Sequence, residues 1–140
     1  MKKKVIFIVI LILAAIGVVV YFFSNKGGNI RNVKTSFTST EHHSEEDIKT
    51  CMNIVKKYFK ENFDGCTLTD LWYDDERSLD SEDGWKKQYN GEEGIVLLSN
   101  FDVDSSGGDG SFNANETYTD WNWILVKNSD GEWILETWGY

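Results

Sequence analysis

An uncharged apolar run close to the N-terminus constrains this chain more than any other feature. Residues 5–23 contain no charged side chain, and Lys2, Lys3 and Lys4 directly precede them. At about 1.5 Å per residue, a helix of this length spans roughly 28 Å, close to the bilayer hydrocarbon thickness of about 30 Å. We therefore expect residues 1–23 to be a signal-anchor whose transmembrane helix contacts membrane lipid through residues 5–23.

A cleaved signal peptide is the alternative interpretation of this run. Signal peptides have an apolar stretch of about 7–15 residues, followed by small residues at the cleavage site. Here the run is longer and ends in Tyr21, Phe22 and Phe23, which favours an uncleaved anchor. The lysines before the run place the N-terminus in the cytoplasm and the rest of this single-pass chain outside the cell membrane.

Beyond the first forty residues the chain is strongly acidic. Residues 1–40 hold six of the fourteen basic residues and none of the twenty-three acidic residues, so residues 41–140 carry a net charge of −15. Such a field repels nucleic acid, anionic lipid headgroups and wall polyanions, and it attracts divalent cations and basic partners. The charge therefore argues against nucleic acid as a partner.

The residues after the anchor divide into a polar segment and one acidic domain. Residues 24–43 are rich in Gly, Ser, Thr and Asn, which predicts a flexible linker. Its root-mean-square reach of about 25 Å would lift the domain clear of the lipid headgroups. A loose alternation of Ile30, Val33 and Phe37 leaves open a short strand that docks on the domain. Residues 44–140 suit a single domain with one core.

The clearest helix in this domain is predicted over residues 45–63. Ser44 is a suitable N-cap, and three acidic residues follow it at the positive end of the helix dipole. Cys51 lies in the first turns of this helix and Cys66 lies just past its end. More than about 20 Å of helix separates them, whereas a disulfide needs Cα atoms within about 7 Å. We therefore expect two separate buried thiols.

Strands are predicted over residues 66–73, 95–103, 117–127 and 132–139, and a short helix over residues 82–89. The last two strands flank a turn, residues 128–131, in which Gly131 is placed for a positive φ. Pairing Lys127 with Glu132 in this hairpin brings Trp121 opposite Trp138. Both faces of the hairpin carry large apolar side chains. Each face must therefore be covered, or it remains available to a partner.

One long helix followed by strands in hairpins indicates an α+β domain, with an amphipathic helix packed on a bent antiparallel sheet. The pattern resembles the cystatin-like and NTF2-like folds. The passages "TYTDWNWILVKNSDGEWILETWGY", "NFDVDSSGGDGSF" and "KKYFKENFDGCTLTDLWYD" resemble a family of uncharacterised single-span extracytoplasmic proteins of Gram-positive bacteria. The resemblance covers most of residues 44–140. It implies the fold and an extracytoplasmic setting, and it carries over no functional residue.

The tryptophans suggest a binding function. Tryptophan rings stack on sugars and anchor protein interfaces, although many of the six in this chain are needed for the core. Trp121, Trp123 and Trp138 are the candidates for an exposed aromatic face. The predicted function is non-covalent binding of an unknown protein or cell-wall ligand, as a sensor, adaptor or inhibitor module.

A calcium site is the only cofactor site that the sequence suggests. Asp102, Asp104 and Ser106 occupy positions one, three and five of a calcium loop, a glycine follows at position six, and Asp109 adds a carboxylate. The match is incomplete, because Asn113 stands where a bidentate glutamate is needed. The segments on either side of this loop also resemble strands, not helices.

An enzyme is the alternative from another functional class. An NTF2-like pocket between helix and sheet can hold an acid–base residue, for which Asp70, Asp120 and Asn122 are the candidates. His42 and His43 are the only histidines, and both fall in or beside the predicted linker, so a Ser–His or Cys–His dyad would need one of them folded against a core residue. A further alternative is an accessory subunit whose membrane helix pairs with another membrane protein. The apolar run contains no small-xxx-small motif, so the sequence gives no specific signal for such pairing.

Overall fold

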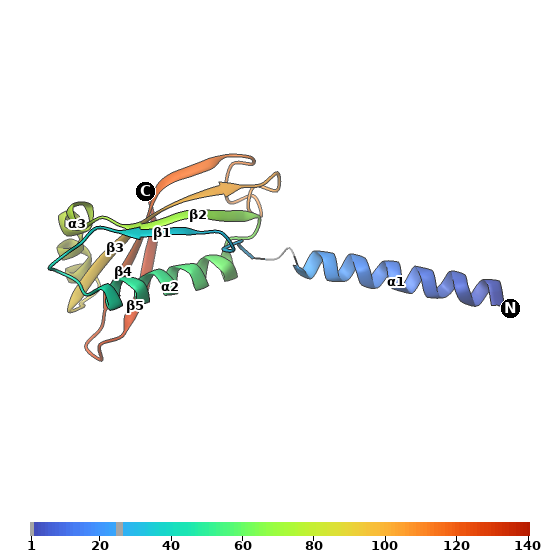
Figure 1. Cartoon of the computed structure of the whole chain (residues 1–140), viewed down its shortest axis with the longest axis horizontal. Helices are drawn as coiled ribbons and strands as arrows, with labels where there is room; N and C mark the ends of the chain where they lie inside the picture. The colour runs from blue at the N-terminus through green and yellow to red at the C-terminus, as the bar shows by residue number, and fades with distance from the viewer. Residues whose placement is uncertain (1, 25–26) are drawn as a thin grey trace.

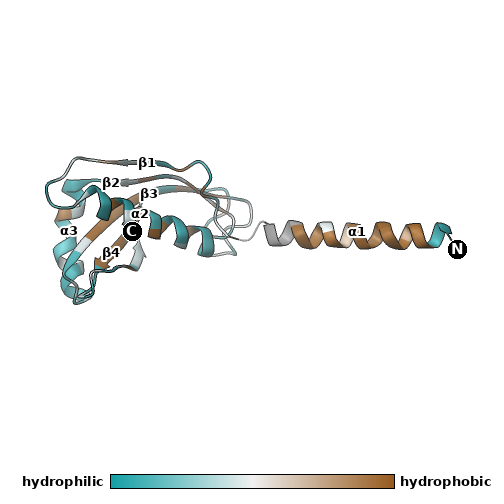
Figure 2. Ribbon diagram, turned by 60° about the horizontal axis from the view of Figure 1, so that its bottom comes forward, coloured by the Kyte–Doolittle hydropathy of each residue, from teal (hydrophilic) through white to brown (hydrophobic). Residues whose placement is uncertain are grey.

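Helix α1 (Lys2–Ser24) contains the apolar run and confirms the predicted N-terminal helix. In the computed structural model, which describes residues 2–24 and 27–140, the window Lys2–Val20 is long and apolar enough to cross a membrane, and none of it is buried. Length and composition suit a membrane anchor or a signal sequence. The helix projects from the other elements (Figure 1), and its apolar character is evident in Figure 2.

The other elements confirm an α+β domain, but the sheet is mixed. Its five strands are β1 (Lys34–Phe37), β2 (Cys66–Tyr73), β3 (Glu93–Val103), β4 (Thr117–Lys127) and β5 (Trp133–Gly139), in that spatial order. Strand β1 pairs with β2 in parallel, and the remaining pairs are antiparallel. The sheet was predicted to be antiparallel, and the parallel β1–β2 pair corrects that prediction. Parallel neighbours require a crossover connection, which the helix between β1 and β2 provides.

The segment predicted as a flexible linker is largely part of the domain. Besides β1, Asn29 forms a parallel bridge to Thr67. The Gly28 amide donates to the Lys60 carbonyl oxygen at 3.0 Å, and a Cβ at Gly28 would lie 2.5 Å from the Phe59 ring and carbonyl oxygen. The Gly27 amide also donates to the Asp64 carboxylate, so only positions 25 and 26 lie between α1 and the first of these contacts. The domain therefore begins near Gly27 and not at Ser44.

Helix α2 (Glu45–Asn62) confirms the predicted amphipathic helix and ends one residue earlier. The Ser44 side chain accepts a hydrogen bond from the Asp47 amide at 3.0 Å, so Ser44 is the N-cap. The buried side of α2 packs against one face of the sheet, where Cys51 and Cys66 are both buried and free, as predicted. The buried residues of α2 are Ile48, Cys51, Met52, Val55 and Phe59.

We expect Ser44→Ala to lower the free energy of unfolding by about 1 kcal/mol. The substitution leaves the Asp47 amide without its capping oxygen, a loss that costs about 0.5–2 kcal/mol in other helices. Urea unfolding followed by circular dichroism measures the change. Ser129→Ala, in the exposed turn before β5, is the control and should leave the midpoint within error. Equal midpoints for the two variants would contradict the capping role.

Helix α3 (Asp75–Gln88) covers part of the opposite face of the sheet and is longer than the predicted helix over residues 82–89. Its N-cap is Asp74, whose side chain accepts from the Arg77 amide at 3.1 Å. Trp85 of α3 and Tyr89 just after it pack against a second apolar cluster on β3 and β4, which consists of Val96, Ile124 and Val126. The central strands are therefore buried on both faces, which explains their apolar colour in Figure 2.

The predicted register of the last hairpin is wrong by one residue next to the turn, and by two residues beyond a bulge between Ile124 and Leu125. Lys127 pairs with Trp133, and Trp123 pairs with Trp138, in place of the predicted Lys127–Glu132 and Trp121–Trp138 pairs. The Asn128 amide donates to the Glu132 carbonyl oxygen at 2.9 Å, which shortens the loop. Gly131 closes it at φ +80°, which confirms the predicted turn residue. A shift of one residue exchanges the two faces of a strand.

Candidate binding surface

The three tryptophans predicted to form one exposed face have different environments. Trp123 is fully buried on the α2 side of the sheet, and its Nε1 donates to Ser99 Oγ at 2.8 Å. It therefore belongs to the core and cannot contact a ligand, which corrects the prediction for this residue. Trp121 is half-buried, and its Nε1 is buried without a hydrogen-bond partner in the described part of the chain. Trp138 keeps 39% of its surface exposed.

Exposed aromatic rings gather at the end of β5. This strand is the last of the sheet, so no described strand pairs with its outer side. Tyr140, 80% exposed, lies just beyond it, with its ring centroid 5.1 Å from that of Trp121. The Trp138 ring lies 4.7 Å from that of Tyr58 on α2. Neighbouring rings therefore support both exposed rings, which limits their motion before a ligand binds.

A cavity of about 360 Å³ lies beside these rings, between α3 and the ends of β4 and β5. Trp85 forms an aromatic wall, and the buried side chains of Val96 and Ile124 contribute apolar surface. Amide and hydroxyl groups complete the lining, which favours a ligand with both apolar and hydrogen-bonding surfaces. We call this surface the edge site and define it by Trp85, Asn122, Thr137, Trp138 and Tyr140.

Local packing positions the edge site. Asn122 Nδ2 donates to the Gly139 carbonyl oxygen at 3.2 Å and so holds the end of β5 against β4. Trp85 stacks on Tyr89, with ring centroids 6.3 Å apart, above the second apolar cluster. The sequence analysis did not assign Trp85 and Tyr140 to a site. The signal for Trp85 was its spacing of four residues from Tyr89 on a predicted helix.

Comparisons with protein-family models, with curated proteins and with solved structures find no match for the chain.

His43 forms a second polar cluster at the N-terminal end of α2. Its side chain is only 5% exposed, and its Nε2 lies 3.0 Å from Glu82 Oε2. Burial lowers the pKa of His43, but the surrounding carboxylates, Glu82 first among them, outweigh burial and raise the pKa above its usual value. Ser78 Oγ donates to the same Glu82 oxygen and does not contact the imidazole in any described interaction. The cluster therefore provides no Ser–His dyad.

Lys127 extends this cluster across the sheet. Its Nζ lies 3.1 Å from Glu93 and 3.5 Å from Asp47. Trp133 Nε1 donates to Asp47 Oδ1 at 2.7 Å, and this contact together with those of Ser44 and Lys127 outweighs burial and lowers the pKa of Asp47. These paired charges join α2, β3, β4 and β5, which indicates a stabilising role.

The acid–base candidates of the enzyme alternative are not gathered between α2 and the sheet. Asp120 is exposed and lies 2.7 Å from the Arg77 guanidinium of α3. Asp70 Oδ2 accepts from Thr69 Oγ1 at 2.8 Å and from Asn100 Nδ2 at 3.5 Å. Asn122 lines the edge site on the opposite face of the sheet.

Of the predicted calcium ligands, Asp104 and Ser106 lie together, whereas Asp102 has a different partner. Asp102 accepts from Thr117 Oγ1 at 2.6 Å, whereas Asp104 accepts from the amide and hydroxyl of Ser106, which lower its pKa. Asp109 lies further along the loop at φ +61°. Among residues 2–24 and 27–140, no group of three or more His, Cys, Asp or Glu residues is arranged to hold a metal ion.

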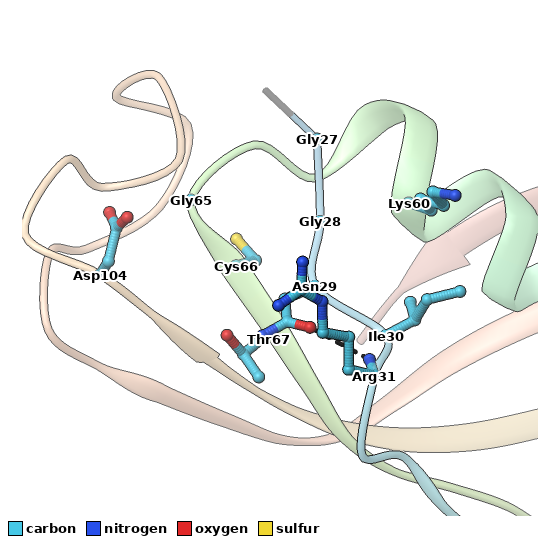
Figure 3. A pocket seen from close by; sticks show the side chains of 10 residues that line it. All are labelled: Gly27, Gly28, Asn29, Ile30, Arg31, Lys60, Gly65, Cys66, Thr67 and Asp104. Carbon is cyan, nitrogen blue, oxygen red and sulfur yellow. Dashed lines mark hydrogen bonds between the residues drawn. The ribbon is translucent and has the colours of Figure 1, made fainter. Parts of the chain in front are cut away.

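Another cavity, of about 580 Å³, lies where the chain enters the domain (Figure 3). Lys60 of α2 and Asp104 of the loop after β3 lie on opposite sides of residues 27–31 in this view. Cys66 also lines the cavity. Burial, with nearby carboxylates, raises the pKa of the Cys66 thiol to about 11. The thiol is therefore protonated at neutral pH and is a poor nucleophile.

Proposed function

We propose that the chain is a membrane-anchored domain that binds an uncharged glycan of the cell wall non-covalently through the edge site. The observation that supports this function is a cavity of about 360 Å³ lined by Trp85 and Tyr140 together with amide and hydroxyl groups, whereas the Trp138 ring packs on Tyr58 of α2. Aromatic rings stack on sugar rings, and Asn122 and Thr137 offer hydrogen bonds to sugar hydroxyls. The net charge of −15 over residues 41–140 disfavours anionic wall polymers.

The anchor in this proposal is α1, which spans the cell membrane once with its N-terminus in the cytoplasm. Lys2, Lys3 and Lys4 support this orientation, because positive residues are retained on the cytoplasmic side. We further propose that the domain is a variant of the cystatin-like and NTF2-like folds. The single long helix on one face of the sheet supports this relationship, to which α3 and the parallel strand β1 are additions.

Binding of soluble N-acetylglucosamine oligomers to the full-length protein in detergent micelles tests the function. We expect a saturable change in tryptophan fluorescence for the wild type. Trp85→Ala and Tyr140→Ala should each weaken binding roughly tenfold, since a stacked ring contributes about 0.5–1.5 kcal/mol beyond its buried area. Trp85 also packs on the second apolar cluster, so its substitution could unfold the domain. The melting temperature of the Trp85→Ala variant is therefore measured in parallel.

Ile134→Lys is the matched control for these variants. Ile134 is 42% exposed on the same strand but does not line the cavity, so the variant should bind oligomers as the wild type does. Absence of saturable binding, or equal affinity in wild type, Trp85→Ala and Tyr140→Ala, would overturn the proposed function. Loss of binding in Ile134→Lys alone would overturn the edge site as the place of contact.

A further inference from the structure

Very little free chain separates α1 from the folded domain. Helix α1 ends at Ser24, and Gly27 already contacts the domain. The three Cα–Cα steps from Ser24 to Gly27 cover at most about 11 Å, even when fully extended. Wherever the end of α1 lies, the first residues of the domain therefore lie within about 11 Å of it.

Hydrogen bonds fix this entry point on the C-terminal end of α2. The Gly27 amide donates to the Asp64 carboxylate, and the Gly28 amide donates to the Lys60 carbonyl oxygen at 3.0 Å. Asn29 continues the contact, donating to the Cys66 carbonyl oxygen at 2.8 Å. A Cβ at Gly27 would lie only 2.2 Å from the Lys60 carbonyl oxygen, so glycine permits the close approach. The end of α2 is therefore held at the same short distance from the anchor.

We infer that this end of the domain rests on the phospholipid headgroups of the bilayer that anchors it. The inference depends on the proposed function in one respect, that α1 spans the membrane. Hydrocarbon of about 30 Å in a bilayer of about 40–45 Å leaves about 5–8 Å of headgroups on each side. A tether of about 11 Å cannot lift the domain far beyond that layer. We call the contact the membrane-proximal surface, and it consists of residues 27–31, Lys60, residues 65–67 and Asp104.

The charge distribution along α2 agrees with this contact. Its first turn contains three acidic residues, Glu45, Glu46 and Asp47, whereas three lysines and one acid, Lys56, Lys57, Lys60 and Glu61, follow in its last two turns. An α-helix of eighteen residues is about 27 Å long, so the acidic end lies well away from the surface that meets the lipid.

Two exposed cations lie on the membrane-proximal surface itself. Arg31 and Lys60 both line its cavity (Figure 3). Cations at this position are attracted to the phosphates of anionic lipids and contribute about 1 kcal/mol each near a charged leaflet. The domain is acidic as a whole, and Asp104 and Asp64 also lie at this end, but Arg31 and Lys60 place two cations beside the anchor. This inference replaces the sequence-based expectation of a domain held clear of the headgroups.

Depth-dependent quenching on the full-length protein in lipid nanodiscs tests the inference. Native Cys51 and Cys66 are buried, so a fluorophore can be attached to one added exposed cysteine. Ser105→Cys places it beside the membrane-proximal surface, and Ser129→Cys places it in the β4–β5 turn, which lies at the far end of the domain in Figure 1. With nitroxide on the lipid headgroups, we expect at least threefold stronger quenching at position 105 than at position 129.

Two further measurements separate the possible outcomes. Twelve Gly and Ser residues inserted after residue 26 should reduce quenching at position 105 to the level at position 129. Co-sedimentation of the wild type with vesicles tests the anchor independently, and a protein that stays in the supernatant overturns the proposed membrane anchorage. An anchored protein with equal quenching at both positions, or with quenching unchanged by the insertion, overturns the headgroup contact alone.

Discussion

Trp123→Ala is expected to lower the free energy of unfolding by about 3–5 kcal/mol. The side chain is fully buried, its ring centroid lies 5.3 Å from that of Phe63, and its Nε1 donates to Ser99. The substitution leaves a large cavity in the core and removes the partner of a buried hydroxyl. Small domains have total stabilities of about 5–15 kcal/mol, so the loss is a large fraction of the whole. Urea unfolding followed by circular dichroism measures it.

Trp138→Ala is the matched control for this substitution. Trp138 pairs directly with Trp123 across the two strands and shares its face, but it is 39% exposed. Its removal should cost about 1 kcal/mol, mainly the contact with Tyr58. Similar losses at the two positions would show that Trp123 is not the core residue described here.

The stability of the domain is expected to fall as the pH rises above neutrality. The carboxylates around His43 raise its pKa, so the folded protein binds the imidazole proton more tightly than the unfolded chain does. This stabilisation is complete below the unfolded-state pKa of about 6.5, and it is lost as the pH rises through the higher folded-state pKa. Thermal midpoints between pH 5.5 and pH 9 measure the slope.

Two variants assign this slope to His43. Glu82→Gln keeps the shape of the partner and removes its charge, so it should lower the midpoint at pH 6 and flatten the curve above it. The penalty at pH 6 is about 1–3 kcal/mol, the usual cost of losing a charged hydrogen-bond partner. His42→Gln is the control, because its pair with Asp75 is more exposed. A curve flattened by His42→Gln and unaffected by Glu82→Gln would contradict the assignment.

Elements with strong local signals could be predicted from the sequence. The N-cap at Ser44 and the apolar spacing after it specify α2 to within one residue. Runs rich in β-branched and aromatic residues specify β2, β3 and β4, and Gly131 marks the turn before β5. In each case the determining interactions join residues close together in the chain.

Elements that depend on distant partners could not be placed. Strand β1 has three exposed residues out of four and owes its conformation to β2, more than thirty residues further on. The first half of α3 is polar and is stabilised by its Asp74 cap and by Ser78, whose Oγ accepts from the Val96 amide at 3.0 Å. The register of β5 depends on hydrogen bonds of the Asn128 backbone and side chain in the turn and on a bulge between Ile124 and Leu125.

The candidate site was predicted only in part for the same reason. Trp138 is an exposed aromatic residue, as expected, whereas Trp123 is buried because α2 covers that side of β4. Trp85 and Tyr140 join Trp138 only once α3 packs on the sheet and β5 takes its actual register. The buried position of His43 depends equally on contacts with α3 that lie thirty-nine residues away.

The parallel strand β1 also determines whether a proteolytic fragment of the domain exposes a sheet edge. It covers the outer edge of β2, and it is itself short and exposed, with Lys34 at its start, which discourages further strand pairing. A protease that cuts before Gly27 releases a domain with this cover in place. A cut after Phe37 leaves an uncovered edge on β2 if the freed segment dissociates, and that fragment is prone to aggregate through strand addition.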